Sequence, residues 1–397
     1  MNASFIAEAT RHKGAAYPPY ATALGFIWCD DSADPVWIYK MLALGTDPSI
    51  AANWIELYRV NKNVGGLNPP AGGVFRKNAI INGNFDFWQR GTLLAAAASS
   101  RYLADKWFTN GIGSTVAPSQ QAFALGQTAV PDEPAYFHRT AVVSSAGAAN
   151  CAYHSQRIEG VRTFAGQQVV LSFWMKADAA KNIAVEFIQS FGTGGAPSAD
   201  VTAIGVTTCA LTTTMAKVTV TATLPSINGK TLGSNGNDYL EIRWWYDAGT
   251  SFNGRTNNLG QRNGTYDIAK VQLEQNCVAT VFEYRPRAAE LLLCQRYAVY
   301  FGPISTQFAA CYGDNSTVIQ APALPFPVPM RAAPTLTVIA GAGAKACTFG
   351  GSTVGTVSGI GSQNTKETFS LILNGSGFST AAFLYFGANA FLFDGDF

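Results

Sequence analysis

The sequence is poor in charge and in histidine. Asp, Glu, Lys and Arg together make up 13% of its 397 residues, against about 25% in an average soluble protein, and three residues are histidine. Lys and Arg are scattered and the net charge is +2, so no basic stripe indicates a nucleic-acid partner. No apolar run approaches the roughly 18 residues of a membrane span, and residues 1–14 lack a signal-peptide layout. We therefore expect neither nucleic-acid binding nor membrane insertion.

Motifs for catalysis and for metal binding are equally scarce. The seven cysteines are spread along the chain without a CxxC or a Cys/His cluster, so the sequence predicts neither a zinc site nor a disulfide framework. This cysteine usage favours folding in a reducing cytoplasm. No GxSxG elbow occurs, and the Gly-rich stretch 341–351 lacks the ending of a phosphate-binding loop. His138 and His154 lie in strand-like contexts, which favours structural roles. We expect no enzymatic activity.

Aromatic residues and glycine are abundant: 12% of the chain is aromatic and 39 residues are glycine, a composition typical of strands and turns. Residues 1–62 alternate apolar strands with an acidic turn and predict a small β-meander. Residues 63–78 collect Gly, Pro and Asn with little apolar content and predict a linker.

The middle of the chain, residues 79–285, consists of segments with strand periodicity. Stretches such as QVVLSFWMKA (168–177) alternate apolar and polar side chains, which is typical of antiparallel strands that cover a core on one side. Asn/Gly-rich turns separate them, so the pattern predicts an antiparallel β-sandwich. Strong helix formers after Pro286 predict one connecting helix over 286–300. Residues 301–397 return to strand patterns and predict a C-terminal β-domain. The fold class is mainly β.

The polar face of the segment YLEIRWWYDAG is the strongest candidate for ligand binding. Alternation places Glu241, Arg243, Trp245 and Asp247 on one side, and a second strand repeats the arrangement. The residues of this second strand are Ser172, Trp174 and Lys176. A sugar can lay its C–H face on a Trp ring while its hydroxyls meet the flanking charges. The alternative is that this face packs under a loop or against another subunit. On the glycan interpretation, Trp245→Ala weakens binding with little loss of thermal stability.

Several ordered motifs resemble a domain of bacteriophage tail-fibre and receptor-binding proteins. NAIINGNFDFWQRGT (78–92) and YLADKW (102–107) resemble its opening, with Lys106 in place of the usual Arg. SQRIEG (155–160) and LSFWMKA (171–177) continue the pattern, and VQLEQNCVATVFEYRPRAAELLLCQRY (271–297) matches it most strongly. In the family pattern a Gly usually comes shortly after the Gln-Leu-Glu; in this sequence Gln275 and Asn276 occupy that stretch. The resemblance covers about 79–340, and residues 1–62 are more weakly similar to units near the attachment end of phage fibres.

The resemblance implies a jelly-roll sandwich akin to carbohydrate-binding modules, in a homotrimeric virion fibre or spike that adheres to host-surface polysaccharide. Residues 1–62 would contact other virion proteins, and the chain would fold in the host cytoplasm before release with particles. Such modules often hold a structural Ca²⁺, for which Asp86 and Asp267 are the candidates here. Two alternatives remain open. One is a depolymerase spike that uses Glu241 and Asp247, and the other is a structural fibre or decoration protein without a ligand.

Overall fold

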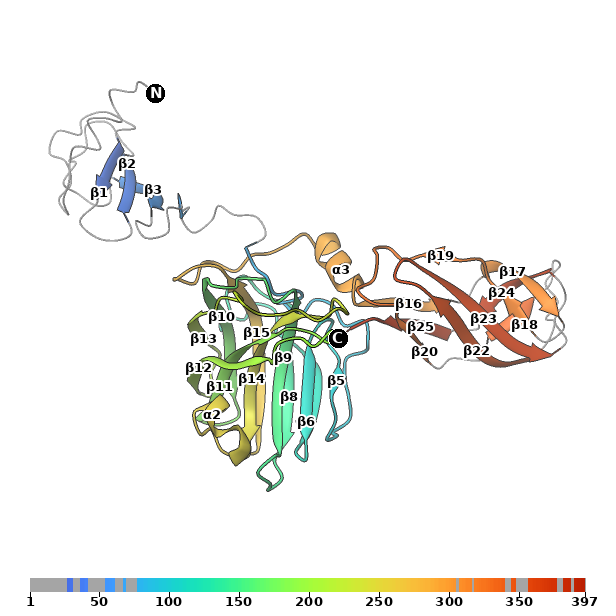
Figure 1. The fold of residues 1–397 in the computed structure, drawn as a ribbon, viewed down its shortest axis with the longest axis horizontal. Coiled ribbons are helices and arrows are strands. Elements are labelled where there is room, and N and C mark those ends of the chain that lie inside the picture. The colour runs from blue at the N-terminus through green and yellow to red at the C-terminus, as the bar shows by residue number, and fades with distance from the viewer. Residues whose placement is uncertain are drawn as a thin grey trace. The chain divides into compact units, whose positions relative to one another are not determined.

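The protein is described by a computed structural model (Figure 1). It describes strands within the first 76 residues and most of the chain from Lys77 onward, in these ranges: 27–30, 36–41, 54–60, 67–68, 77–304, 307–315, 318–339, 344–347, 356–376, 381–386 and 389–396. The chain divides into two compact units, Met1–Arg76 and Lys77–Phe397.

The first unit contains a four-stranded antiparallel sheet in which neighbours in sequence are neighbours in space. Its strands are β1 (Ile27–Asp30), β2 (Val36–Met41), β3 (Trp54–Val60) and β4 (Leu67–Asn68). This order is that of a meander, as the strand pattern predicts. Strand β4 lies inside the predicted linker, because Leu67 and Asn68 pair with Val60 and Arg59.

The second unit begins with an antiparallel sandwich of two sheets, visible in Figure 1 as the cyan to yellow strands. The five-stranded sheet has the order β13 (Ala216–Thr223), β10 (Gln168–Ala177), β15 (Gly264–Glu274), β8 (Tyr136–Val143) and β7 (Thr115–Ala122). The six-stranded sheet has the order β12 (Val201–Leu211), β11 (Lys181–Ser190), β14 (Tyr239–Ala248), β9 (Cys151–Glu159), β6 (Phe108–Ile112) and β5 (Arg101–Tyr102). The predicted jelly-roll β-sandwich is confirmed.

The core lies between the two sheets, and the period-2 pattern identifies its residues. In β10 and β14 the predicted apolar sets all belong to one buried cluster: Val169, Leu171, Phe173, Met175, Leu240, Ile242, Trp244 and Tyr246. Alternation directs these side chains inward because successive residues of a strand point to opposite faces. The remaining residues of the same strands therefore form the two outer faces of the sandwich.

The segment before the first sandwich strand differs from the strand pattern predicted for residues 79–285. Residues 79–91 form turns rather than a strand, and Asn82 and Phe85 have positive φ angles of 55° and 57°. The segment lies against β15, since Val271 N donates to the Gly83 carbonyl at 2.9 Å. A Cβ at Gly83 would lie 2.2 Å from the Val271 carbonyl oxygen, so this close approach requires glycine.

A short helix and two further sheets complete the chain. Helix α3 (Arg287–Gln295) is shorter than the predicted 286–300, because strand β16 begins at Ala298. One sheet has the order β16 (Ala298–Ile304), β25 (Asn389–Asp394) and β20 (Thr335–Ile339). The other has the order β19 (Leu324–Pro325), β23 (Thr368–Ser376), β18 (Val318–Gln320), β17 (Gln307–Asn315), β24 (Ala381–Phe386) and β21 (Ala344–Cys347), with β22 (Thr356–Asn364) also paired to β23. In the described part of the chain, no helix has the length and apolarity needed to cross a membrane.

Candidate functional site

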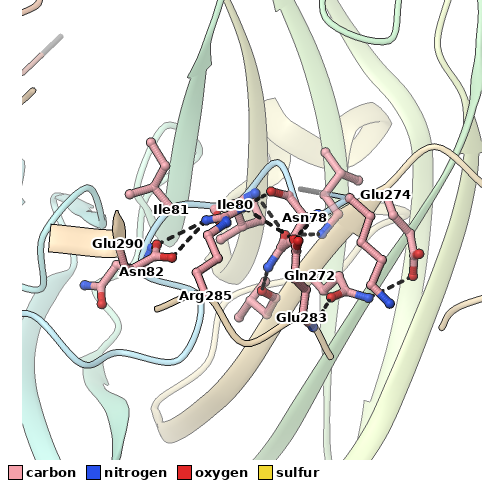
Figure 2. Close-up of polar contacts among 12 residues, drawn as sticks. Asn78, Ile80, Ile81, Asn82, Gln272, Glu274, Glu283, Arg285 and Glu290 are labelled. Carbon is pink, nitrogen blue, oxygen red and sulfur yellow. Dashed lines mark hydrogen bonds and ion pairs between the residues drawn. The ribbon is translucent and has the colours of Figure 1, made fainter. Parts of the chain in front are cut away.

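The motif residues around 272–290 form a polar network that closes the sandwich (Figure 2). Asn78 is at its centre: its Nδ2 donates to the Val271 carbonyl at 3.1 Å, and its backbone N–H donates to Glu283 Oε2 at 2.8 Å. Arg285 donates to the Ile80 carbonyl at 3.0 Å, so the segment after β15 holds the segment before the first strand. These contacts join residues more than 190 positions apart in sequence.

The glutamates of this network are occupied by protein donors. Glu274 Oε1 accepts from the Thr280 backbone N–H at 2.8 Å and from Gln272 Nε2 at 2.9 Å. Glu290 forms an ion pair with Arg285 at 3.0 Å and also accepts from the backbone N–H of Asn82. Neighbouring carboxylates can indicate acid–base chemistry, but here each glutamate of the network accepts hydrogen bonds from protein donors. The motif that carries the family resemblance therefore has a structural role.

Gln89 and Arg90 join the sandwich to the C-terminal strands. Gln89 Nε2 donates to Asp105 Oδ2 at 2.6 Å and to the Ala298 carbonyl at 2.8 Å. Arg90 forms ion pairs with Asp394 at 2.9 Å and Asp396 at 2.6 Å, with only 5% of its side chain exposed. Burial raises the pKa of Asp105 to about 6, although the nearby charge of Arg90 lowers it. Gln89 and Arg90 thus reach the C-terminal β-strands, at separations of 209 and 304 positions in sequence.

The outer face of β14 corrects the first glycan-binding hypothesis. Glu241, Arg243 and Trp245 do share this face, but the Trp245 side chain is completely buried. The turn η2 (Thr250–Phe252) and helix α2 (Asn253–Thr256) follow β14, and Phe252 packs 5.0 Å from the Trp245 ring. Arg255 lies over the ring at 5.3 Å. A sugar cannot stack on this ring, so the alternative of a face covered by a loop is the one that the structure supports.

The charged neighbours of Trp245 are also committed to the protein. Glu241 is fully buried and pairs with Arg243 at 2.8 Å and with Arg157 at 3.5 Å. Burial acts to raise the pKa of Glu241, but the charges and hydrogen bonds of its neighbours, Arg243 first, outweigh it and hold the pKa below its usual value. Asp247 is fully buried as well, and its Oδ2 accepts from Ser114 Oγ at 2.6 Å. Neither carboxylate is accessible, so the hypothesis that these two residues cut a polysaccharide is wrong.

The second predicted pair, Trp174 and Lys176, lies on an outer face where both residues stay partly exposed. Both residues are on the outer side of the five-stranded sheet, where Lys176 pairs in register with Asp267 and Asp267 with Arg139. Arg139 donates to both Asp267 oxygens, at 2.7 and 2.8 Å, and Lys176 Nζ lies 3.6 Å from the same carboxylate. This hydrogen bond to Asp267 raises the pKa of Arg139. We call the surface formed by these four residues the Trp174 face.

The Trp174 face keeps groups that a ligand can use. Arg139 and Lys176 have 35% and 34% of their side chains exposed, and with one carboxylate between them the row carries a net charge of +1. Trp174 pairs with Ala269 on one side and Lys217 on the other. Its half-buried ring packs against a small outer cluster that includes Val130 and Met215. Its indole N–H makes no hydrogen bond to any residue that the structure describes. A ring with a free N–H beside charged donors is an arrangement that can bind a polyhydroxylated ligand.

Comparison of the tryptophans in residues 77–397 singles out Trp174. Trp107, Trp244 and Trp245 are completely buried. Trp88 is half-buried but donates its indole N–H to the Phe85 carbonyl at 2.6 Å. Trp174 alone in this described set combines an accessible ring with an unused N–H. Residue types and spacing could not show which of Trp174 and Trp245 is exposed, because both lie in an alternating strand with charged neighbours.

The predicted Ca²⁺ ligands do not fit a cation. Both oxygens of Asp267 accept from Arg139, and Lys176 adds a second positive charge, so Asp267 is not available to a metal. Asp86 accepts from Asn84 Nδ2 at 3.1 Å, and burial raises the pKa of its carboxyl group. Within the described ranges, no group of three or more His, Cys, Asp or Glu side chains is placed to hold a metal ion.

The two sandwich histidines lie in the core, as predicted. His138 and His154 are fully buried with ring centroids 4.3 Å apart, and His154 stacks on Trp107 at 4.8 Å. Burial lowers the pKa of His138 to about 3. Burial lowers the pKa of His154 well below its usual value, and the nearby His138 lowers it further. Both rings are therefore neutral packing elements at physiological pH.

Comparisons with known proteins concern the fold. No protein-family model matches the chain, and no curated protein matches it. Similar solved structures include the enzymatically active domain of tailspike protein 4 from bacteriophage CBA120, at 14% identity over 50% of this chain with a TM-score of 0.29. A CBM4 structure matches at 15% identity over 49% of this chain and 98% of its own, with a TM-score of 0.27.

A third structure comes from work on carbohydrate-binding modules of the β-sandwich superfamily. It matches at 10% identity over 63% of this chain and 86% of its own, with a TM-score of 0.29. The match to the tailspike spans 22% of that chain's length.

Proposed function

We propose that this chain is a non-enzymatic fibre or spike subunit of a phage or phage-like particle, and that it binds host-surface glycan through the Trp174 face. The observation that carries the proposal is the half-buried Trp174 ring, with its unused indole N–H, beside the Lys176–Asp267–Arg139 row. A pyranose can place its C–H face on the indole while its hydroxyls accept from Arg139 and Lys176. Asp267 orients both donors.

The chemistry of the row suggests which glycans bind best. Asp267 neutralises only one of the two flanking cations, so the row retains a net positive charge. A saccharide with a carboxylate or phosphate substituent gains a charge-assisted hydrogen bond that a neutral sugar lacks. We expect acidic surface polysaccharides to be preferred, and we expect this preference to weaken as ionic strength rises.

The virion role rests on the motif series in residues 78–107 and 271–297, which resembles phage receptor-binding proteins. In this proposal the chain is a homotrimer, residues 1–62 contact other virion proteins, and the protein leaves the host cell with the particle. One sugar contact is weak, but three linked sites can raise overall binding by roughly 10²–10⁴. Measurement of the oligomeric mass by light scattering tests the trimer directly.

The experiment compares three forms of the full chain on an array of bacterial surface polysaccharides: wild type, Trp174→Ala and Tyr239→Ala. Tyr239 is the matched control, because it is a half-buried aromatic residue at the outer face of the opposite sheet. We expect Trp174→Ala to weaken binding by about tenfold or more, which corresponds to about 1.4 kcal/mol. Tyr239→Ala should leave binding within about twofold of wild type.

Four results would overturn the proposal in different ways. Unchanged binding by Trp174→Ala removes the Trp174 face from the function. Loss of binding in Tyr239→Ala alone moves the site to the six-stranded sheet. Absence of binding to any polysaccharide, by a protein that still assembles on particles, favours a purely structural fibre. Release of new reducing ends from a bound polysaccharide would instead show a depolymerase.

A further inference from the structure

The C-terminal domain contains a cleft with neutral hydrogen-bonding walls. Its volume is about 450 Å³, within the roughly 300–1,000 Å³ of small-molecule sites. Six polar residues line it: Gln320, Gln363, Asn364, Thr365, Thr368 and Ser370. The apolar segment 321–323 forms the rest of the lining. Among the described residues around the cleft, none that lines it is charged or aromatic.

Both walls of the cleft are held by hydrogen bonds within the domain. The turn between β22 and β23 is fixed by Thr365, whose Oγ1 accepts from the backbone N–H groups of Thr368 at 2.9 Å and Glu367 at 3.1 Å. On the other wall, Ala321 N donates to the Leu371 carbonyl at 3.0 Å. The cleft is therefore formed before a ligand arrives, which lowers the entropy cost of binding.

Two glutamines present unused groups beside each other. Gln320 Nε2 donates to Ser370 Oγ at 3.0 Å and to Gln363 Oε1 at 3.3 Å. Ser370 in turn donates to the Ala321 carbonyl at 2.6 Å, which fixes the orientation of the Gln320 amide. Gln320 Oε1 and Gln363 Nε2 make no hydrogen bond to any described residue. One free acceptor and one free donor thus lie on two exposed, linked side chains.

We propose that this cleft binds a neutral saccharide unit, as a second ligand site separate from the Trp174 face. A sugar hydroxyl both donates and accepts, so it matches an amide oxygen and an amide N–H held side by side. The segment 321–323 offers an apolar surface to the C–H groups of the ring. A carboxylate or phosphate would lose its hydration here without gaining a cation, so acidic sugars are excluded.

The test uses the full chain with Trp174→Ala, which removes the first site, on an array of neutral glucose, galactose and mannose oligosaccharides and their uronic-acid counterparts. We expect residual binding to at least one neutral oligosaccharide. Adding Gln320→Ala and Gln363→Ala should weaken that binding by about tenfold, since two hydrogen bonds are lost. Gln275→Ala, at an exposed glutamine of the sandwich, is the matched control and should have no effect.

The cleft proposal is overturned when the Trp174→Ala protein binds no neutral oligosaccharide, or when the two glutamine substitutions leave its binding unchanged. Equal binding of uronic-acid oligosaccharides at this site also overturns it. Failure of the Trp174 face gives a different result. If that face binds no glycan, wild type and Trp174→Ala bind the whole array equally, while the glutamine substitutions still reduce binding of neutral sugars.

Discussion

Replacement of Trp245 by alanine distinguishes a core residue from a binding residue. The ring is completely buried among Tyr153, Leu259 and Phe252, and its Nε1 donates to Glu186 Oε1 at 3.1 Å. Removal of a buried Trp side chain costs about 3–5 kcal/mol through lost burial and the cavity left behind. For a unit of this size, each kcal/mol lowers the melting temperature by roughly 2–4 °C, which predicts a decrease of about 6–20 °C.

The measurement is differential scanning calorimetry of the full chain, with Trp245→Phe and Trp174→Ala as comparisons. Phenylalanine keeps most of the buried volume and should recover much of the lost stability. Trp174→Ala removes a half-buried ring on the open face and should cost about 1 kcal/mol, with its main effect on glycan binding. A Trp245→Ala protein that melts within 2 °C of wild type (about 0.5–1 kcal/mol at this size) would refute the assignment of Trp245 to the core.

Two further substitutions and a pH titration test the electrostatics. Arg90→Ala leaves buried carboxylates without their cation and should destabilise the protein by about 3–5 kcal/mol, measured by calorimetry against Arg90→Lys. His138 and His154 have folded-state pKa values far below the unfolded value of about 6.5, so stability is complete above that pH and decreases as pH falls toward 3. Asp105, whose pKa rises to about 6, opposes this loss below pH 6. His138→Phe should flatten the acid limb of a urea-unfolding series; an unchanged pH dependence would contradict the buried-histidine account.

Period-2 alternation determined which side chains of each strand face the core. It assigned Val169, Leu171, Phe173 and Met175 to one side of β10, and all four are buried between the sheets. This prediction succeeds because strand geometry is local: each residue is on the opposite face from its neighbour whatever the rest of the chain does. The mainly β fold class follows from the same rule applied along the chain.

Only the tertiary structure decided which outer face is open. Trp174 and Trp245 each lie in an alternating strand with charged neighbours, yet η2 and α2 help to bury Trp245 completely, whereas the small cluster around Val130 leaves Trp174 partly exposed. Likewise, the partners of Gln89 and Arg90 lie some 200 and 300 positions away in sequence. Alternation says which way a side chain points, but coverage depends on where a loop or a distant strand folds back. That placement is set by the summed packing of the whole chain, and no short segment contains it.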